Sequence, residues 1–119
     1  MVLRTKSVTQ TQVVAILESL PQAEVLHIYG DADIATSNEL QRAIAEIHSP
    51  LPVIVDLTEC RFIDTTAITV LIRAYRRLGG GSRLRVVVSA QSHVERVFQV
   101  VHLSEIMPVS NSVEESLVA

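Results

Sequence analysis

Two threonine hydroxyls follow an aspartate at the predicted start of a helix. Asp64, Thr65 and Thr66 come a short loop after the apolar run 53–57, and they open a segment whose apolar residues have the spacing of one helix face. The first turn of a helix carries unpaired backbone N–H groups and the positive end of the helix dipole, so it favours an anion such as a phosphate. A hydroxyl there is a candidate for phosphorylation, with Thr65 the first choice and Thr66 the second. The alternative, that Asp64 or Thr65 simply caps the helix, is more common and is compatible with phosphorylation.

A second polar segment, residues 30–33, lies between a predicted strand and a predicted helix and contains Asp31 and Asp33. In α/β sheets, such junctions at one edge line the surface that receives a ligand or a partner. The two carboxylates could bind a metal ion or repel a phosphate. The alternative, which we prefer, is a turn, because Gly30 and the aspartates are favoured in turns for backbone reasons.

The surrounding sequence predicts strands that alternate with helices. Strands are expected over residues 13–17, 24–29, 53–57, 84–88 and 106–109, and helices over 37–47, 64–78, 92–101 and from 112. The first two strands are joined tightly and should be antiparallel, whereas the strand–helix alternation predicts parallel pairing for the rest. We therefore predict one α/β domain over residues 13–119, with a mixed β-sheet of four to five strands and about four helices. Residues 1–12 are expected to be a loose arm or a frayed strand.

The predicted helices carry recognisable end signals. Thr36 or Ser37 is a reasonable N-cap for the first helix, and residues 112–115 fit a capping box for the last. The second helix has Arg73, Arg76 and Arg77 in its C-terminal half and is followed by three consecutive glycines. These arginines share its exposed side, which is usually a solvated face but could be a partner-binding edge.

Composition excludes several classes of function. The 119-residue chain has a formal net charge of −3, two tyrosines, two phenylalanines and no tryptophan, so it lacks the basic field and the stacking residues of a nucleic-acid binder. Its single cysteine and the spacing of its four histidines predict no disulfide, metal site or cofactor. No apolar run has membrane length, and the N-terminus lacks a signal-peptide core, so we expect a cytoplasmic protein without membrane insertion.

Enzymatic readings find little support in the residues. No nucleophile elbow or Ser/His/Asp arrangement is evident, so we expect a protein that is not an enzyme. An aspartyl-phosphate receiver would need a lysine late in the fold, whereas Lys6 is the only lysine. Cys60 could be a reactive thiol, but a small apolar filler is the preferred role.

Residues 53–67 closely resemble the signature of STAS domains, which include the bacterial anti-sigma factor antagonists, also called anti-anti-sigma factors. That signature is an apolar strand, Asp-Leu, a short loop, and Asp-Ser-Ser/Thr-Gly at a helix start. Residues 30–33 with Thr36 resemble the family's Gly-Glu-Leu-Asp segment and the threonine after it. Residues 94–103 resemble the helix before the last strand, and 112–117 resemble the closing segment. The resemblance extends from about residue 24 to residue 117.

The resemblance implies a phosphorylation switch. In the family, the first hydroxyl after the aspartate is phosphorylated with ATP by the anti-sigma factor, which is itself a kinase, and this hydroxyl maps to Thr65. The unphosphorylated antagonist binds the anti-sigma factor and frees the sigma factor, and a phosphatase resets the system. The expected partner-binding residues are Asp31, Asp33, Thr36, Asp64, Thr66 and Ala67, in a monomer or weak dimer.

This chain departs from the family pattern at three places. Two threonines replace the commoner serine pair, Ala67 replaces a glycine where the partner approaches, and His102 stands where a glycine usually ends the third helix. A second hypothesis is therefore a STAS scaffold or subunit of a signalling or lipid-transport complex, which docks without being phosphorylated.

Overall fold

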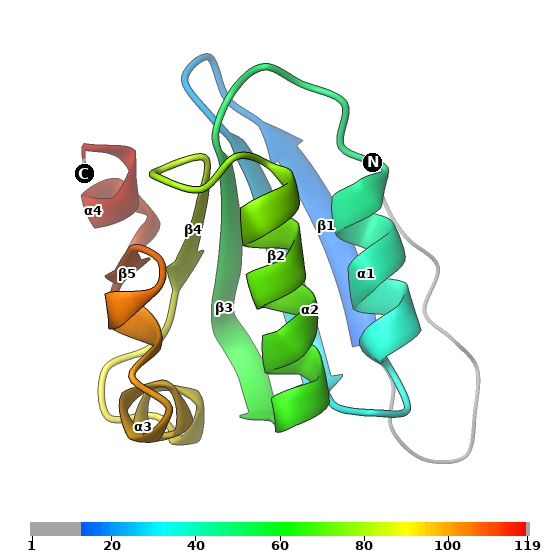
Figure 1. The fold of residues 1–119 in the computed structure, drawn as a ribbon, viewed down its shortest axis with the longest axis vertical. Helices are drawn as coiled ribbons and strands as arrows, with labels where there is room; N and C mark the ends of the chain where they lie inside the picture. The colour runs from blue at the N-terminus through cyan, green and yellow to red at the C-terminus, as the bar shows by residue number, and fades with distance from the viewer. Residues whose placement is uncertain (1–12, 119) are drawn as a thin grey trace.

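The computed structural model describes residues 13–118 (Figure 1). They form one five-stranded sheet in the order β1-β2-β3-β4-β5. β1 (Val13–Ser19) is antiparallel to β2 (Glu24–Ala32), whereas β3 (Val53–Ile63), β4 (Leu84–Val87) and β5 (Val109–Ser110) continue the sheet in parallel. The predicted α/β class and mixed sheet are confirmed. The arm predicted at residues 1–12 lies outside the described residues.

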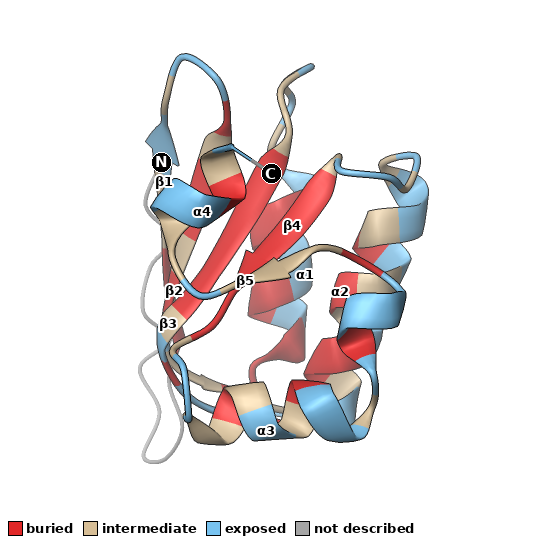
Figure 2. Ribbon diagram, turned by 90° about the vertical axis from the view of Figure 1, so that its left-hand side faces the viewer, coloured by how far each residue is buried: buried red, intermediate tan, exposed pale blue. Residues whose placement is uncertain are grey.

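The helices cover both faces of the sheet. α1 (Ser37–Ala45) and α2 (Thr65–Arg77) lie side by side on one face, and α3 (His93–Val100) lies near the end where β3 finishes (Figure 1). α4 (Val113–Leu117) packs on the opposite face (Figure 2). A short 3-10 helix, η1 (Leu103–Glu105), precedes β5 and was not predicted. None of the helices in residues 13–118 is long and apolar enough to cross a membrane.

Burial on both faces explains the apolar run that begins β3. Val53, Val55 and Leu57 point into the larger core beneath α1 and α2, whereas Ile54 packs on the other face with α4. All four side chains are almost completely buried, in keeping with a central strand covered on both sides. Figure 2 shows β3 and β4 as the most continuously buried strands.

The predicted ends of β2 and β3 were wrong, because both strands are longer. Gly30 was expected to end β2 and residues 58–62 to form a loop, yet Gly30 pairs with Cys60 and Ala32 pairs with Ile63. The register shifts twice along this extension, and Gly30 takes a φ of +103°, which favours glycine. The two strands therefore reach the same end of the sheet together, and the segments that follow them become neighbours.

Smaller differences have local causes. The last strand was predicted over residues 106–109, but it is Val109–Ser110 and begins just after Pro108, because the three residues of η1 come before it. His102 adopts a left-handed conformation, with a φ of +56°, which is uncommon for a residue other than glycine. The cap of α4 is also only partly as predicted. Ser112 Oγ accepts from Glu115 N at 3.1 Å, but the Glu115 carboxylate accepts from Asn111 N and not from the N–H of Ser112.

Candidate functional site

Asp64 caps α2, and Thr65 is the first residue of that helix. Asp64 has extended backbone angles, and its Oδ1 accepts a hydrogen bond from Ala67 N at 3.1 Å. Its carbonyl oxygen accepts from Ile68 N at the same distance, which is the first backbone bond of the helix. The capping role predicted for Asp64 or Thr65 therefore belongs to Asp64.

The candidate phosphoacceptor is open to solvent. Thr65 is exposed and Thr66 is partly exposed, and both residues line a surface groove where the helix begins. The neighbouring Thr69 donates its hydroxyl to the carbonyl oxygen of Thr65 at 2.8 Å. Thr65 thus combines exposure with the anion-favouring end of a helix of 13 residues.

Asp33 and Thr36 fix the shape of the loop between β2 and α1. Asp33 Oδ1 accepts from the backbone N–H of Ala35 at 3.0 Å and of Thr36 at 3.2 Å. The Thr36 hydroxyl donates to the carbonyl oxygen of Asp31 at 2.7 Å and accepts from Asp33 N at 3.0 Å. The predicted turn is correct for Asp33, whereas Asp31 lies in β2. Thr36 precedes α1, but its side chain makes no capping bond to that helix.

Asp64 joins this loop to the start of α2. Its second oxygen, Oδ2, accepts from Ile34 N at 3.0 Å, and its own N–H donates to Ala32 O at 3.1 Å. The two segments that the sequence singled out, around residues 33 and 64, are therefore brought together by direct hydrogen bonds. Both oxygens of one carboxylate hold them, so Asp64 is a positioning residue for the whole surface.

A groove of about 380 Å³ runs from this surface between α1 and α2. We call it the threonine groove. It is lined by Ser37 and Gln41 from α1 and by Thr65, Thr66, Thr69, Val70 and Arg73 from α2. Ser37, Gln41, Thr69 and Val70 were not predicted as site residues. Thr69 and Arg73 could have been grouped with Thr66 from the sequence, because residues three and seven positions apart lie on the same face of a helix.

The structure buries two of the predicted partner-binding residues. Ala67 has no exposed surface and Thr36 is 1% exposed, so neither side chain can touch a docked partner in this conformation. Thr36 instead shapes the loop, and the Ala67 methyl group belongs to the core. Asp31 is partly exposed and forms a 3.7 Å ion pair with the exposed Arg61. Asp33, Asp64 and Thr66 are partly exposed as well.

Apolar side chains near this surface were not predicted. Ile34, in the loop tied to Asp64, is 75% exposed. Phe62 is 42% exposed and stacks on the ring of His93, with ring centroids 5.2 Å apart. Exposed apolar groups beside polar ones are typical of protein docking surfaces.

Cys60 does not belong to a reactive centre. It is buried, and its thiol contacts the carbonyl oxygen of Phe62 at 3.2 Å. Burial raises the pKa of the Cys60 thiol, which keeps it protonated and weakly nucleophilic. The role of apolar filler fits these facts.

His27, on the face of the sheet opposite α1 and α2, lies between two carboxylates. Its Nδ1 lies 2.7 Å from Asp56 Oδ2, and its Nε2 lies 2.9 Å from Glu18 Oε1. Partial burial alone would lower the pKa of His27, but the hydrogen bonds and charges of the two carboxylates outweigh it and raise that pKa. Both ring nitrogens are thus engaged. Residues 13–118 contain no group of three or more histidine, cysteine or acidic side chains that could hold a metal ion.

Fold and geometry together define a small α/β domain with a mixed sheet and a polar surface at the start of α2. A family model for the STAS domain matches residues 15–116, and the chain belongs to this family. A comparison with curated proteins finds no match to this chain.

Solved structures of anti-sigma factor antagonists share the fold. One from Mycobacterium paratuberculosis is 21% identical, with a TM-score of 0.81 over 89% of this chain and 92% of that one. A STAS domain protein from Planctomyces limnophilus is 17% identical, with a TM-score of 0.65 over 87% and 94%. The Bacillus cell fate determinant SpoIIAA, in its phosphorylated form, is 19% identical, with a TM-score of 0.56 over 87% and 96%.

Proposed function

We propose that this protein is an anti-sigma factor antagonist regulated by phosphorylation of Thr65. Unphosphorylated, it binds an anti-sigma factor that is also a serine/threonine kinase, and so makes a sigma factor available for transcription in the bacterial cytoplasm. The kinase transfers the terminal phosphoryl group of ATP to Thr65 Oγ1 and thereby releases the antagonist, and a phosphatase restores the free hydroxyl. The observation that carries the proposal is the exposed Thr65 at the start of a helix capped by Asp64.

The electrostatic consequences of a phosphate at Thr65 favour release. A phosphate adds about −1.5 to −2 charges. The start of α2 favours such a charge by only about 0.3–1 kcal/mol. A docked partner, in contrast, would bury the phosphate beside the carboxylates of Asp64 and Asp33, and an unpaired buried charge costs several kcal/mol. A net penalty of about 2.8 kcal/mol would already weaken binding about 100-fold.

The proposed docking surface combines the loop around Asp33, the start of α2 and the exposed Ile34. Ile34 supplies the apolar contact, and its N–H bond to Asp64 links it to the phosphoacceptor end of α2. Thr36 and Ala67 lie beneath this surface. The Thr36 hydroxyl holds the loop, and the N–H of Ala67 holds the first helical turn against Asp64.

Variants of Thr65 test the switch. Each anti-sigma kinase of the source genome is titrated with wild type, Thr65→Ala and Thr65→Glu, and the dissociation constants are measured by calorimetry. Thr65→Ala should retain binding to the cognate partner and Thr65→Glu should weaken it at least tenfold. Ser82→Glu is the matched control, because it adds the same charge at an exposed residue in the turn beyond the far end of α2. Equal affinities for the two Thr65 variants would refute the switch.

A second candidate is a STAS scaffold that docks without phosphorylation. The exposed side chain of Ile34 is available to a docked partner in that case as well. Intact-mass measurement after incubation with each kinase and ATP separates the two functions. A phosphate on wild type that is absent from Thr65→Ala supports the switch, and if only Thr66→Ala loses it, the acceptor is Thr66. A partner that binds but never adds phosphate supports the scaffold.

A further inference from the structure

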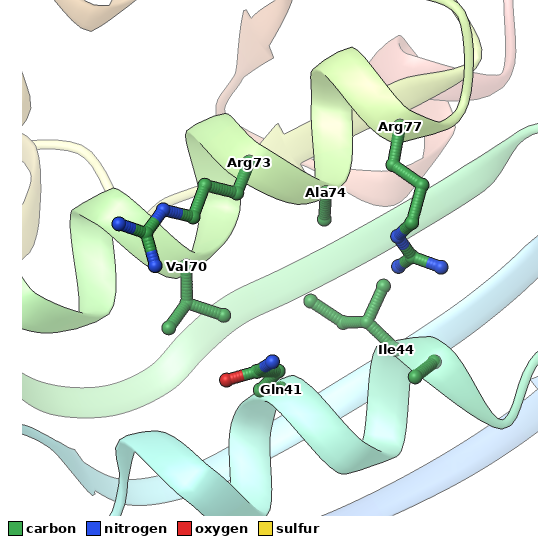
Figure 3. Close-up of a pocket in the computed structure, with 7 residues that line it drawn as sticks. Gln41, Ile44, Val70, Arg73, Ala74 and Arg77 are labelled. Carbon is green, nitrogen blue, oxygen red and sulfur yellow. The ribbon is translucent and has the colours of Figure 1, made fainter.

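A second groove continues from the threonine groove along α1 and α2, toward the C-terminal end of α2. It has a volume of about 340 Å³, and we call it the arginine groove. Ile44, Val70 and Ala74 provide apolar surface, and Arg73 and Arg77 border it from α2. Figure 3 shows the Arg77 guanidinium extending toward α1 above Ile44, whereas the Arg73 side chain runs along α2 and places its guanidinium beside Val70.

The charge of this groove contrasts with that of the chain. The protein has a net charge of −3, yet α2 contains three arginines and no acidic residue. Within residues 13–118, neither Arg73 nor Arg77 has a hydrogen-bond or ion-pair partner. A helix C-terminus favours cations, which accounts for some positive charge there. It does not account for two arginines that border an apolar depression.

The spacing of the two arginines indicates the shape of the ligand. Arg73 and Arg77 are one helical turn apart, about 6 Å at the surface, and apolar side chains lie between the helices beside them. One small anion would meet one guanidinium and leave the rest of the groove unfilled. An amphipathic helix with acidic residues at i and i+4 would meet both arginines and place apolar side chains on Ile44 and Val70.

We propose that the arginine groove docks an acidic amphipathic helix of a partner protein. Apolar side chains of that helix pack between α1 and α2, and two of its carboxylates pair with Arg73 and Arg77. Guanidinium groups suit such pairs because they can donate two parallel hydrogen bonds to one carboxylate. This docking site goes beyond the proposed function and does not require phosphorylation of Thr65.

The test uses a synthetic helix as the probe. A peptide of about 14 residues, four helical turns, carries leucine on one face and glutamate on both flanks. It is titrated into the 15N-labelled protein, and chemical-shift changes are followed by NMR. We expect the shifts to concentrate on the residues of the arginine groove. A peptide with lysine in place of each glutamate should bind at least tenfold more weakly.

Arginine variants identify the contacts. Arg73→Glu or Arg77→Glu should weaken the probe about tenfold, and the milder Arg77→Gln about threefold, since a partly exposed ion pair is worth about that much. Arg76→Glu is the matched control, because Arg76 is exposed on the same helix but lines neither groove. Its affinity should stay within about twofold of wild type, and Thr65→Ala should bind the probe like wild type.

Three results would overturn the proposal. The first is an absence of shifts in the groove at millimolar probe, and the second is an equal loss of affinity in Arg76→Glu and Arg77→Glu. The third is binding of dodecanoate ions to the groove without binding of the peptide, which would assign it to a lipid carboxylate. Because no kinase or ATP is used, failure here leaves the Thr65 proposal standing, and failure of the Thr65 variants leaves this one standing.

Discussion

Replacing Asp64 should loosen two elements at once, because its two carboxylate oxygens hold different segments. Oδ1 caps α2 through Ala67 N, and Oδ2 ties the β2–α1 loop through Ile34 N. Loss of an N-cap costs about 1 kcal/mol, and loss of a hydrogen bond to a partly exposed carboxylate costs about 1 kcal/mol more. We expect Asp64→Ala to lower the free energy of unfolding by about 2 kcal/mol.

Asp64→Asn separates the two effects. The amide has one carbonyl oxygen, so it can accept one of the two N–H bonds but not both. Its cost should be about 1 kcal/mol, half that of alanine. If the carbonyl keeps the cap, hydrogen exchange at Ala67 N stays slow while exchange at Ile34 N becomes faster.

Urea unfolding and amide hydrogen exchange measure these changes. Glu59→Ala is the control, since it removes one negative charge from an exposed position on β3. The reasoning is refuted if Asp64→Ala is as stable as Glu59→Ala, or if exchange at Ile34 N is unchanged in both Asp64 variants.

Three further predictions concern residues away from this surface. Because folding raises the pKa of His27, its contribution to stability is full below the pKa of the unfolded state and is lost as pH rises through the pKa of the folded state. The stability difference between wild type and His27→Gln should therefore be larger at pH 5 than at pH 9, as measured by urea titrations at the two pH values. Cys60 should react with a thiol reagent such as dithionitrobenzoate only on unfolding, so a fast reaction of the native protein would contradict its burial. Leu71→Ala should destabilise the protein by about 2–5 kcal/mol in urea, because Leu71 is fully buried on the core-facing side of α2, and a loss below 1 kcal/mol would contradict that packing.

Local patterns predicted the elements that depend on local chemistry. The run 53–57 was predicted to be a buried strand because it is almost continuously apolar, as is typical of a strand covered on both faces, and the structure buries it on both. The start of α2 was predicted because an aspartate just before a helical pattern commonly caps the helix by accepting a hydrogen bond from one of its first N–H groups, as Asp64 does. These features need only a few neighbouring residues, which is why the sequence suffices for them.

The extension of β2 and β3 required information from across the chain. Thr58, Glu59 and Arg61 suggested a loop because their polarity breaks the apolar run. They lie in a strand nevertheless, because β2 continues beside them and supplies backbone partners as far as Ala32. Pairing between strands 30 residues apart is a tertiary property, and no local period reveals it.

The grooves could not be predicted for a similar reason. The arginines of α2 were expected on one exposed side of the helix, but the position of α1 opposite them depends on how the two helices pack. Gln41 lines both grooves because of that packing alone. The sequence therefore indicated which residues could form a site, and the helix pair determined which of them share a depression.

Ala67 departs from the family pattern, but its surroundings in the structure give it a different role from the one expected from the sequence. A methyl group in place of glycine was expected to narrow the surface that a partner approaches. Ala67 is instead completely buried, and its N–H is held by Asp64 Oδ1. Within a helix, alanine is more favourable than glycine by about 1 kcal/mol, so this residue stiffens the first turn that presents Thr65. Because the Ala67 methyl group is buried in the core, it is not expected to hinder phosphoryl transfer to the exposed Thr65.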